Sequence, residues 1–338
     1  MKLAGKHVLV TGGSRGVGKG AALGLAAEGA HVFITGRRLE ALESCAEALV
    51  DAGGTCTPIV CDHDRDDDVR AAVERVSTEA GELHALVNNV FQSPTGPVFN
   101  TPFWKQPLSM WDTMHRVGLR SHYVASALAA PLLIKGAESG GALIANISSF
   151  GGASYQVNVA YGVGKAGVDR LARDMARDLR PHSVCVVSLY PGVVRTERVL
   201  AGELPFSTEV SESPEFTGRA IAALLQDDAR MERSGRVHVV AELAREYGFT
   251  DTDGSTPASL RELAAEAKRK KAEAKKQKAA KPRGDQPGAT GAGAMSAHEE
   301  PDSIEASSTS DRSSMSDRSS VSDRSSNQDR PTKNETRP

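Results

Sequence analysis

The sequence predicts an α/β fold, a doubly wound parallel sheet of seven strands in a single domain that a disordered C-terminal tail follows. Over residues 1–250, short apolar runs alternate with Ala/Leu-rich helical stretches, a pattern typical of right-handed β-α-β crossovers. The runs are near-continuously apolar, as in Val8-Leu9-Val10, and such strands occur where helices cover both faces of a sheet. Beyond residue 250 the chain becomes polar and repetitive.

The expected strands are the short β-branched runs at 7–11, 31–35, 55–61, 85–88, 142–147, 184–189 and 237–240. Helical patterns separate them, the clearest over residues 39–52, 66–80, 111–133 and 159–180. The helix at 66–80 has acids in its first turn, where the helix dipole favours them. The prolines of the 91–111 stretch argue against a helix there; they are Pro94, Pro97, Pro102 and Pro107.

Residues 251–338 are expected to lie outside this domain. A basic, Ala-rich segment, 258–283, carries ten Lys/Arg against three acids and favours helix. Farther on, a six-residue unit, Ser-Asp-Arg-Ser-Ser-x, occurs three times. Such a polar repeat buries too little surface to offset its ordering entropy, which predicts a disordered Ser/Asp/Arg-rich tail. Binding of RNA or an acidic surface by the basic segment is the less favoured alternative, because no aromatic residues interleave it.

Composition and charge exclude several classes of protein. The net charge of −2 gives no global attraction to nucleic acid or anionic membrane. None of the four cysteines forms a C-x-x-C pair, and none has a histidine at metal-ligand spacing. We find neither an N-terminal signal peptide nor an apolar run near the ~18 residues of a membrane span. These features predict a soluble, cytoplasmic protein with no metal site, no transmembrane segment and no nucleic-acid partner.

A glycine-rich turn connects the first strand to the first helix. It reads Thr11-Gly12-Gly13-Ser14-Arg15-Gly16-Val17-Gly18. Gly12 permits the tight turn, while Gly16 and Gly18 allow the backbone and the helix to approach a pyrophosphate. The N-terminus of the helix supplies unpaired N–H donors and a partial positive charge. In this strand-turn-helix context the pattern predicts a dinucleotide site formed by Gly12, Ser14, Arg15, Gly16, Val17 and Gly18.

The end of the second strand indicates which dinucleotide binds. An NAD site usually has an acid at this position, but the chain reads Gly36-Arg37-Arg38. The guanidinium groups of Arg15 and Arg37 can pair with a 2′-phosphate through charge-assisted hydrogen bonds. We therefore expect NADP(H) as the cofactor. The alternative is that Arg37 and Arg38 are solvated residues of the first helical turn.

Tyr161 and Lys165 begin a long helical pattern at a spacing of four residues, which puts both side chains on one face. A cation near a phenol stabilises the phenolate and lowers its pKa from about 10 toward the range useful for acid-base catalysis. The pair predicts a tyrosine general acid, although this spacing is also common by chance.

Five ordered motifs strengthen that interpretation, and together they resemble the short-chain dehydrogenase/reductase superfamily over residues 5–250. They are the glycine turn, Asn88-Asn89, Ser148-Ser149, Tyr161-x-x-x-Lys165 and Pro191-Gly192. Further segments are similar to one subfamily, the member 1 dehydrogenase/reductases; they include Phe103-Trp104, Val117-Gly118-Leu119-Arg120 and Leu243-Ala-Arg-x-Tyr247-Gly.

The resemblance implies roles for individual residues. Tyr161 would be the general acid, Lys165 would hold the nicotinamide ribose, and Ser149 would donate a hydrogen bond to the substrate oxygen. Ser148 stays open as the alternative serine, because Ser149 precedes Tyr161 by one residue less than usual. Other residues would complete the cofactor site: Asp62 at the adenine, Asn88 at the sheet end, and Pro191, Val194 and Thr196 at the nicotinamide carboxamide.

The sequence departs from the superfamily pattern at two places. Gly118 stands where a catalytic asparagine usually positions a water in the proton relay, and Val90-Phe91 replaces Ala-Gly after the paired asparagines. These departures leave the resupply of the proton unexplained.

The predicted function is NADPH-dependent hydride transfer between nicotinamide and a carbonyl or alcohol. Five aromatic residues within 91–111 predict a wall for a bulky apolar ketone such as a steroid or xenobiotic, or else packing within the core or on a partner subunit. Residues 197–215 are the expected lid. Relatives imply a homodimer or homotetramer. The alternative function is a weakly active NADP(H)-binding regulator or scaffold.

Overall fold

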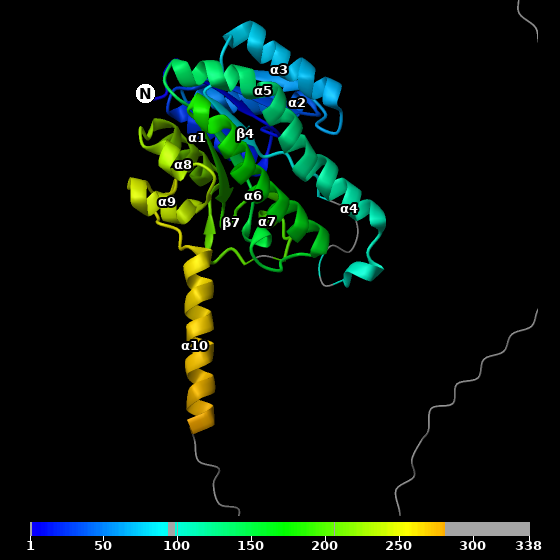
Figure 1. Cartoon of the computed structure of the whole chain (residues 1–338), viewed down its shortest axis with the longest axis vertical. Coiled ribbons are helices and arrows are strands. Elements are labelled where there is room, and N and C mark those ends of the chain that lie inside the picture. The colour runs from blue at the N-terminus through cyan, green and yellow to red at the C-terminus, as the bar shows by residue number, and fades with distance from the viewer. Residues whose placement is uncertain (1, 94–98, 100, 206, 281–338) are drawn as a thin grey trace, which may run out of the picture. The chain divides into compact units, whose positions relative to one another are not determined.

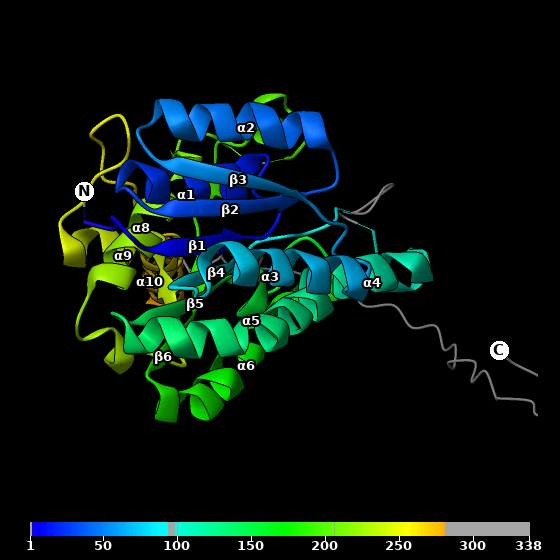
Figure 2. The same ribbon diagram turned by 90° about the horizontal axis from the view of Figure 1, so that it is seen from above.

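Seven parallel strands form the central sheet of the computed structural model, which describes residues 2–93, 99, 101–205 and 207–280. The strands are β1 (His7–Val10), β2 (His31–Gly36), β3 (Thr55–Val60), β4 (Ala85–Asn88), β5 (Ala142–Ile147), β6 (Val184–Tyr190) and β9 (Val237–Val239). Their order is β3-β2-β1-β4-β5-β6-β9, and Figure 2 shows β3, β2 and β1 side by side. The predicted doubly wound, seven-stranded sheet is confirmed. The predicted disordered tail falls in residues 281–338, outside the described residues.

Helices cover both faces of the sheet, and each face has its own core (Figures 1 and 2). One core packs α1 (Gly16–Ala27), α2 (Leu39–Asp51), α8 (Pro214–Gln226) and α9 (Val240–Tyr247) on the sheet. The other packs α3 (Asp66–Ala80), α5 (Ser121–Glu138) and α6 (Val159–Leu179). Successive strand side chains point to opposite faces, so Val8 and Val10 enter the first core while Leu9 enters the second. This alternation explains why most residues of the inner strands are apolar on both faces.

Helices α1 and α8 pack backbone against backbone through glycines. A Cβ atom built on Gly20 of α1 would lie only 2.0 Å from the carbonyl carbon of Pro214, where α8 begins. The contact places α1, and with it the glycine turn, against the rest of the first core.

Substitution of Gly20 by alanine is expected to destabilise the protein. Overpacking of this kind lowers the free energy of unfolding by about 1–3 kcal/mol, which outweighs the gain of about 1 kcal/mol in helix propensity. Thermal denaturation of Gly20→Ala measures the loss. Gly162→Ala on α6 is the control, since its Cβ would meet its nearest atom at an ordinary 3.4 Å. Equal melting temperatures for Gly20→Ala and the unaltered protein would contradict the prediction.

The helix expected over 111–133 is longer and interrupted. It begins as α4 (Leu108–His115), directly after Pro107, passes through a π-helical turn at Arg116–Arg120 and continues as α5. The expectation that Pro107 excludes helix up to residue 111 is wrong, because a proline just before a helix leaves its hydrogen bonds intact. The π-helical turn contains Gly118, and such turns are frequent at functional sites.

One helical stretch within the described ranges, 108–138, is long and apolar enough to span a membrane by composition alone. Half of its most apolar window is buried inside the fold, and α5 packs on α3 and the sheet. A core helix passes the same test, so the stretch is weak evidence for a membrane span.

The folded part continues beyond residue 250. Asp251 and Ser259 are both 1% exposed, and residues 1–281 form one compact unit. Ser259 donates a hydrogen bond to Glu242 of α9, and Glu262 in the first turn of α10 (Leu260–Ala280) pairs with Arg245. The segment after 250, expected outside the domain, is therefore attached to α9 by named contacts.

Candidate active site

The site residues lie where strands end. Parallel strands bring their carboxyl ends to one edge, and ligands bind at the edge where the strand order reverses, here between β1 and β4. The glycine turn follows β1, Asn88 and Asn89 follow β4, and Ser149 follows β5. Tyr161 and Lys165 come from the first turns of α6. Motifs as far apart in sequence as Thr11 and Lys165 thus share one edge.

Hydrogen bonds from two neighbouring strand ends hold the glycine turn. Gly12 has φ +68°, a conformation that favours glycine, and its N–H donates to Thr35 Oγ1 at 3.2 Å. Thr35 Oγ1 is in turn 2.7 Å from the Nε2 of buried His63. On the other side, the Asn89 amide donates to the carbonyls of Thr11 and Gly12, each at 3.0 Å. Hydrogen bonds within the protein therefore fix the shape of the turn.

A carboxylate lies at the N-terminus of α1. The N–H of Gly16 donates to Glu197 Oε2 at 3.1 Å, and Glu197 begins the short helix α7 (Glu197–Leu200). This N–H is one of the donors that the sequence assigns to a pyrophosphate. This contact was not predictable from the sequence, because Gly16 and Glu197 are 181 residues apart and no local pattern connects them.

The arginines expected at the 2′-phosphate are exposed beside the glycine turn. Arg15, Arg37 and Arg38 have no ion-pair partner among the described residues, so their guanidinium groups are available for an anion. Ser14 lies against Gly36, the last residue of β2, since its Oγ would be 3.2 Å from a Cβ there. The Asp62 carboxylate, at the end of β3, accepts from the N–H of Asp64 at 3.1 Å.

The serine and the tyrosine of the predicted site meet. Tyr161 Oη donates to Ser149 Oγ at 2.8 Å, and Asn158, the N-cap of α6, fixes the start of the helix by accepting from the N–H of Tyr161 at 2.9 Å. Ser148 points elsewhere, because its hydroxyl donates to the backbone carbonyl of Lys165 at 3.2 Å. Of the two candidate serines, the geometry favours Ser149.

Lys165 is almost completely buried. Its Nζ donates to the carbonyl of Ile147 at 3.0 Å and lies 5.9 Å from the centre of the Tyr161 ring. The ammonium and the phenol therefore face the same space, as the spacing of four residues predicts.

Burial sets the acid-base properties of the pair. Desolvation raises the pKa of Tyr161 above its ordinary value, while the hydrogen bond with Ser149 lowers it. Desolvation lowers the pKa of Lys165 to about 8, against the opposing effect of Asp169. Sequence analysis expected the ammonium to lower the pKa of the phenol, but in the protein alone desolvation has the larger effect because both groups are buried.

Asn88 supports the sheet rather than pointing into the crevice. Its amide nitrogen donates to Ser126 Oγ and to Asn146 Oδ1, both at 2.9 Å. Beside it, the ring of buried His122 is 3.1 Å from the carbonyl of Val90. Asn88 thus ties β4 to β5 and α5, and it positions the backbone that follows.

The segment after β6 carries the residues expected at the carboxamide. Pro191 and Val194 are buried, and Val194 pairs with Glu212 through the small strands β7 (Val193–Val194) and β8 (Ser211–Glu212). Glu212 is 1% exposed, and burial raises its pKa to about 8 while a hydrogen bond from the backbone of Gly192 lowers it. Thr196 packs near Gly16. The expected lid is thus joined to the Pro191-Gly192 turn.

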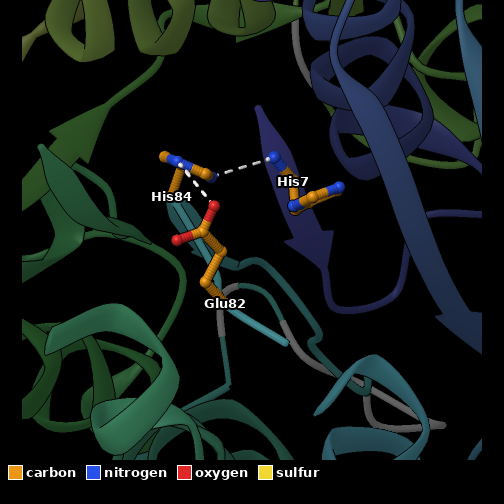
Figure 3. A group of neighbouring side chains, drawn as sticks. All are labelled: His7, Glu82 and His84. Carbon is orange, nitrogen blue, oxygen red and sulfur yellow. Dashed lines mark hydrogen bonds and ion pairs between the residues drawn. The ribbon is translucent and has the colours of Figure 1, made fainter. Parts of the chain in front are cut away.

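His7, Glu82 and His84 form a group of potential metal ligands away from this site, at the opposite ends of β1 and β4 (Figure 3). His84 Nδ1 accepts from the backbone N–H of His7 at 3.1 Å, and its Nε2 lies 3.1 Å from Ser139 Oγ. An imidazole that accepts at Nδ1 carries its proton on Nε2, which leaves no lone pair for a metal. We therefore interpret the group as a hydrogen-bonded strand end.

Comparison with known proteins decides the family. The sequence pattern of the short chain dehydrogenases matches residues 6–201, more than half of the chain. The chain belongs to the short-chain dehydrogenase family. Dehydrogenase/reductase SDR family member 1 of Mus musculus is 41% identical over 75% of this chain and 85% of its own. The Homo sapiens protein of that name is 42% identical over 74% of this chain and 84% of its own.

Solved structures agree with the fold of this short-chain dehydrogenase. The Pseudomonas aeruginosa RhlG/NADP active-site complex has a TM-score of 0.62 at 29% identity, over 70% of this chain and 95% of that one. A short-chain type dehydrogenase/reductase from Mycobacterium ulcerans also has a TM-score of 0.62, at 28% identity, over 71% and 90%. The protein is therefore an oxidoreductase with a nicotinamide-cofactor fold, and the suspected resemblance to member 1 is confirmed.

Proposed function

We propose that the protein is an NADPH-dependent reductase of carbonyl compounds that also runs in reverse as an alcohol dehydrogenase. The observation that carries the proposal is the contact of Tyr161 Oη with Ser149 Oγ at 2.8 Å, with the Lys165 ammonium 5.9 Å from the centre of the tyrosine ring. A carbonyl oxygen placed between the two hydroxyls receives hydrogen bonds from both. This arrangement suits the transfer of one proton to one oxygen.

The bound cofactor would supply a hydride to the carbonyl carbon. As negative charge develops on the substrate oxygen, Ser149 stabilises it by a hydrogen bond and Tyr161 transfers its phenolic proton. The Lys165 ammonium then stabilises the phenolate that remains. The pyrophosphate would be held by Gly12, Gly16, Val17 and Gly18. Glu197 would give up its hydrogen bond with the N–H of Gly16, which would then donate to the pyrophosphate. Asp62 would contact the adenine, and Pro191, Val194 and Thr196 the carboxamide.

The preference for NADPH is assigned to Arg15 and Arg37, with Ser14 in the adjoining turn. Both guanidinium groups are exposed beside the crevice, and the similar RhlG structure is a complex with NADP.

Arg37→Ala is expected to weaken NADPH binding at least tenfold and to leave NADH binding unchanged, since a charge-assisted bond contributes about 1.5–3 kcal/mol. Titration of cofactor fluorescence measures both dissociation constants, and Arg38→Ala shows how much a neighbouring positive charge contributes. Equal or tighter binding of NADH by the unaltered protein would refute the preference.

The substrate class is proposed from the exposed apolar residues that precede and begin α4, the helix whose Met114 lines the gap beside Tyr161. Phe103 is 61% exposed and Trp104 71% exposed, and Leu108 and Trp111 are exposed on the same stretch. Such a surface suits a bulky apolar ketone, a steroid or a xenobiotic. A panel of ketones graded by size, with NADPH consumption as the readout, tests this. Faster turnover of small polar ketones than of bulky apolar ones would overturn the assignment.

A homodimer or homotetramer is proposed as the assembled form, and the cytoplasm as its location. Apolar side chains lie exposed on the outer surface of α5 and α6, among them Tyr123. Light scattering of the purified protein gives the number of subunits directly.

A further inference from the structure

The two departures from the superfamily pattern touch each other. Gly118 lies in the π-helical turn and Phe91 in the loop after β4, yet a Cβ built on Gly118 would be 2.8 Å from Phe91 Cδ2 and 3.2 Å from Cε2. Real Cβ atoms do not approach an aromatic carbon so closely. The ring therefore occupies the space into which any side chain at position 118 would project.

The same ring faces the catalytic pair. Its centroid is 5.2 Å from Lys165 Nζ, within the range of a cation–π contact. It also meets the ring of Tyr161 edge to face, with centroids 6.0 Å apart and planes at 86°. Phe91, Gly118, Tyr161 and Lys165, together with Met114, line one small gap that does not admit a water molecule.

We propose that Phe91 and Gly118 act as one unit that takes the place of the asparagine-held water: the glycine makes room, and the ring positions the Lys165 ammonium. Phe91 is then a positioning residue for the reaction, and the ammonium is held by the Ile147 carbonyl on one side and by a π face on the other. The catalytic part of this inference rests on the proposed function, whereas the packing part does not.

The charged surroundings of Lys165 determine the sign of the pH effect. Asp169 on its own helix favours the ammonium, whereas buried His122 on α5 is uncharged in this range because desolvation lowers its pKa to about 3. Among the described residues, the phenol of Tyr161 and the Ile147 carbonyl also face Lys165. Burial places the pKa of Lys165 at about 8, so the ammonium is present below that pH and is lost as the pH rises through it. Activity that needs the ammonium must fall on the alkaline side.

The packing part is tested by a double-mutant cycle in thermal stability. Gly118→Ala is expected to lower the melting temperature by about 3–6 °C, as overpacking in a domain of this size does. In a Phe91→Ala background the same change is expected to be neutral or stabilising, because alanine is the better helix former. A reversal of sign supports the unit. An equal effect of Gly118→Ala in both backgrounds overturns it.

The positioning part is tested by the pH profile of kcat/KM. Phe91→Leu keeps most of the bulk but removes the π face that stabilises the ammonium. The alkaline limb of the profile is therefore expected to shift to lower pH by about half a unit. Phe91→Tyr keeps the face and is expected to restore the limb. Phe249→Leu is the matched control, since that ring packs on Phe216 in the first core, with centroids 5.3 Å apart. An unmoved limb in a folded Phe91→Leu protein overturns the role of the ring.

The two tests also separate this inference from the proposed function. A protein that turns over none of the ketones contradicts the proposed function, and the stability cycle still reports on the packing because it needs no turnover. An active protein that lacks coupling between positions 91 and 118 overturns the inference alone.

Discussion

Tyr161→Phe is expected to lower kcat by a factor of about 10³ or more and to leave the dissociation constant of NADPH within about twofold. The change removes one oxygen, and that oxygen is the atom that donates to Ser149 at 2.8 Å. Phenylalanine fills the same volume, and the N-cap that Asn158 provides acts on the backbone, so α6 is expected to keep its start. Loss of turnover with retained binding is the signature of a proton donor.

Steady-state kinetics with NADPH and a ketone from the panel measure kcat, and fluorescence titration measures binding. Tyr155→Phe is the matched control, since Tyr155 is 75% exposed and lies on the segment just before α6. A Tyr161→Phe enzyme with a near-normal rate would refute the assigned acid. If the unaltered protein binds NADPH tightly and turns over none of the ketones, the alternative of a cofactor-binding regulator is favoured.

Asp251→Ala is expected to lower the free energy of unfolding by about 2–3 kcal/mol, and the melting temperature by about 4–12 °C. The Asp251 side chain is completely buried, and its carboxylate accepts from the N–H of Ser213 at 2.7 Å and from Arg195 at 3.2 Å. It also bonds the Ser213 hydroxyl, the N-cap of α8. Alanine leaves the buried N–H of Ser213 without its acceptor and removes the buried carboxylate that pairs with Arg195.

Asp253→Ala is the control, because Asp253 is 55% exposed and lies 3.7 Å from the same guanidinium. Its loss is expected to change stability by less than about 0.5 kcal/mol. Thermal and urea denaturation measure the free energy of unfolding of both variants. Equal decreases in the two would contradict the prediction that the buried Asp251 carboxylate stabilises the fold more than the exposed Asp253 does.

Two truncated chains extend this prediction to the C-terminal segment. Ending the chain at residue 280 keeps every hydrogen bond described here, and we expect reductase activity and stability to be retained. Ending it at residue 250 removes Asp251, Ser259 and α10, and we expect the loss of stability seen in Asp251→Ala or more. If the chain that ends at residue 250 is a stable and active enzyme, the boundary of the folded unit lies at residue 250.

The strands and long helices were predictable because their signals are local. Each strand is a short apolar run, and the helix at 66–80 opens with acids. Gly12 and Gly16, both with positive φ, mark the turn that the sequence assigned to a dinucleotide. Tyr161 and Lys165 share a helix face by spacing alone.

Contacts between distant segments were not predictable. Nothing in one sequence says that Phe91 lies on Gly118, that Glu197 reaches the N–H of Gly16, or that Asp251 holds the N-cap of α8. The sequence also assigned the wrong dominant effect on the Tyr161 phenol, because desolvation depends on how deeply the packed chain buries a group. The two serines at the end of β5 differ only in the direction in which the strand presents them.

The sequence by itself thus determined the order of strands and helices, the family and the chemical groups at the sheet edge, because local periodicity and motif spacing suffice for these. The tertiary structure decided which serine meets the tyrosine, what holds the lysine ammonium and which residues after 250 contact α9. These depend on side chains that the packing of separate elements brings to within a few ångströms, and no local pattern records such distances.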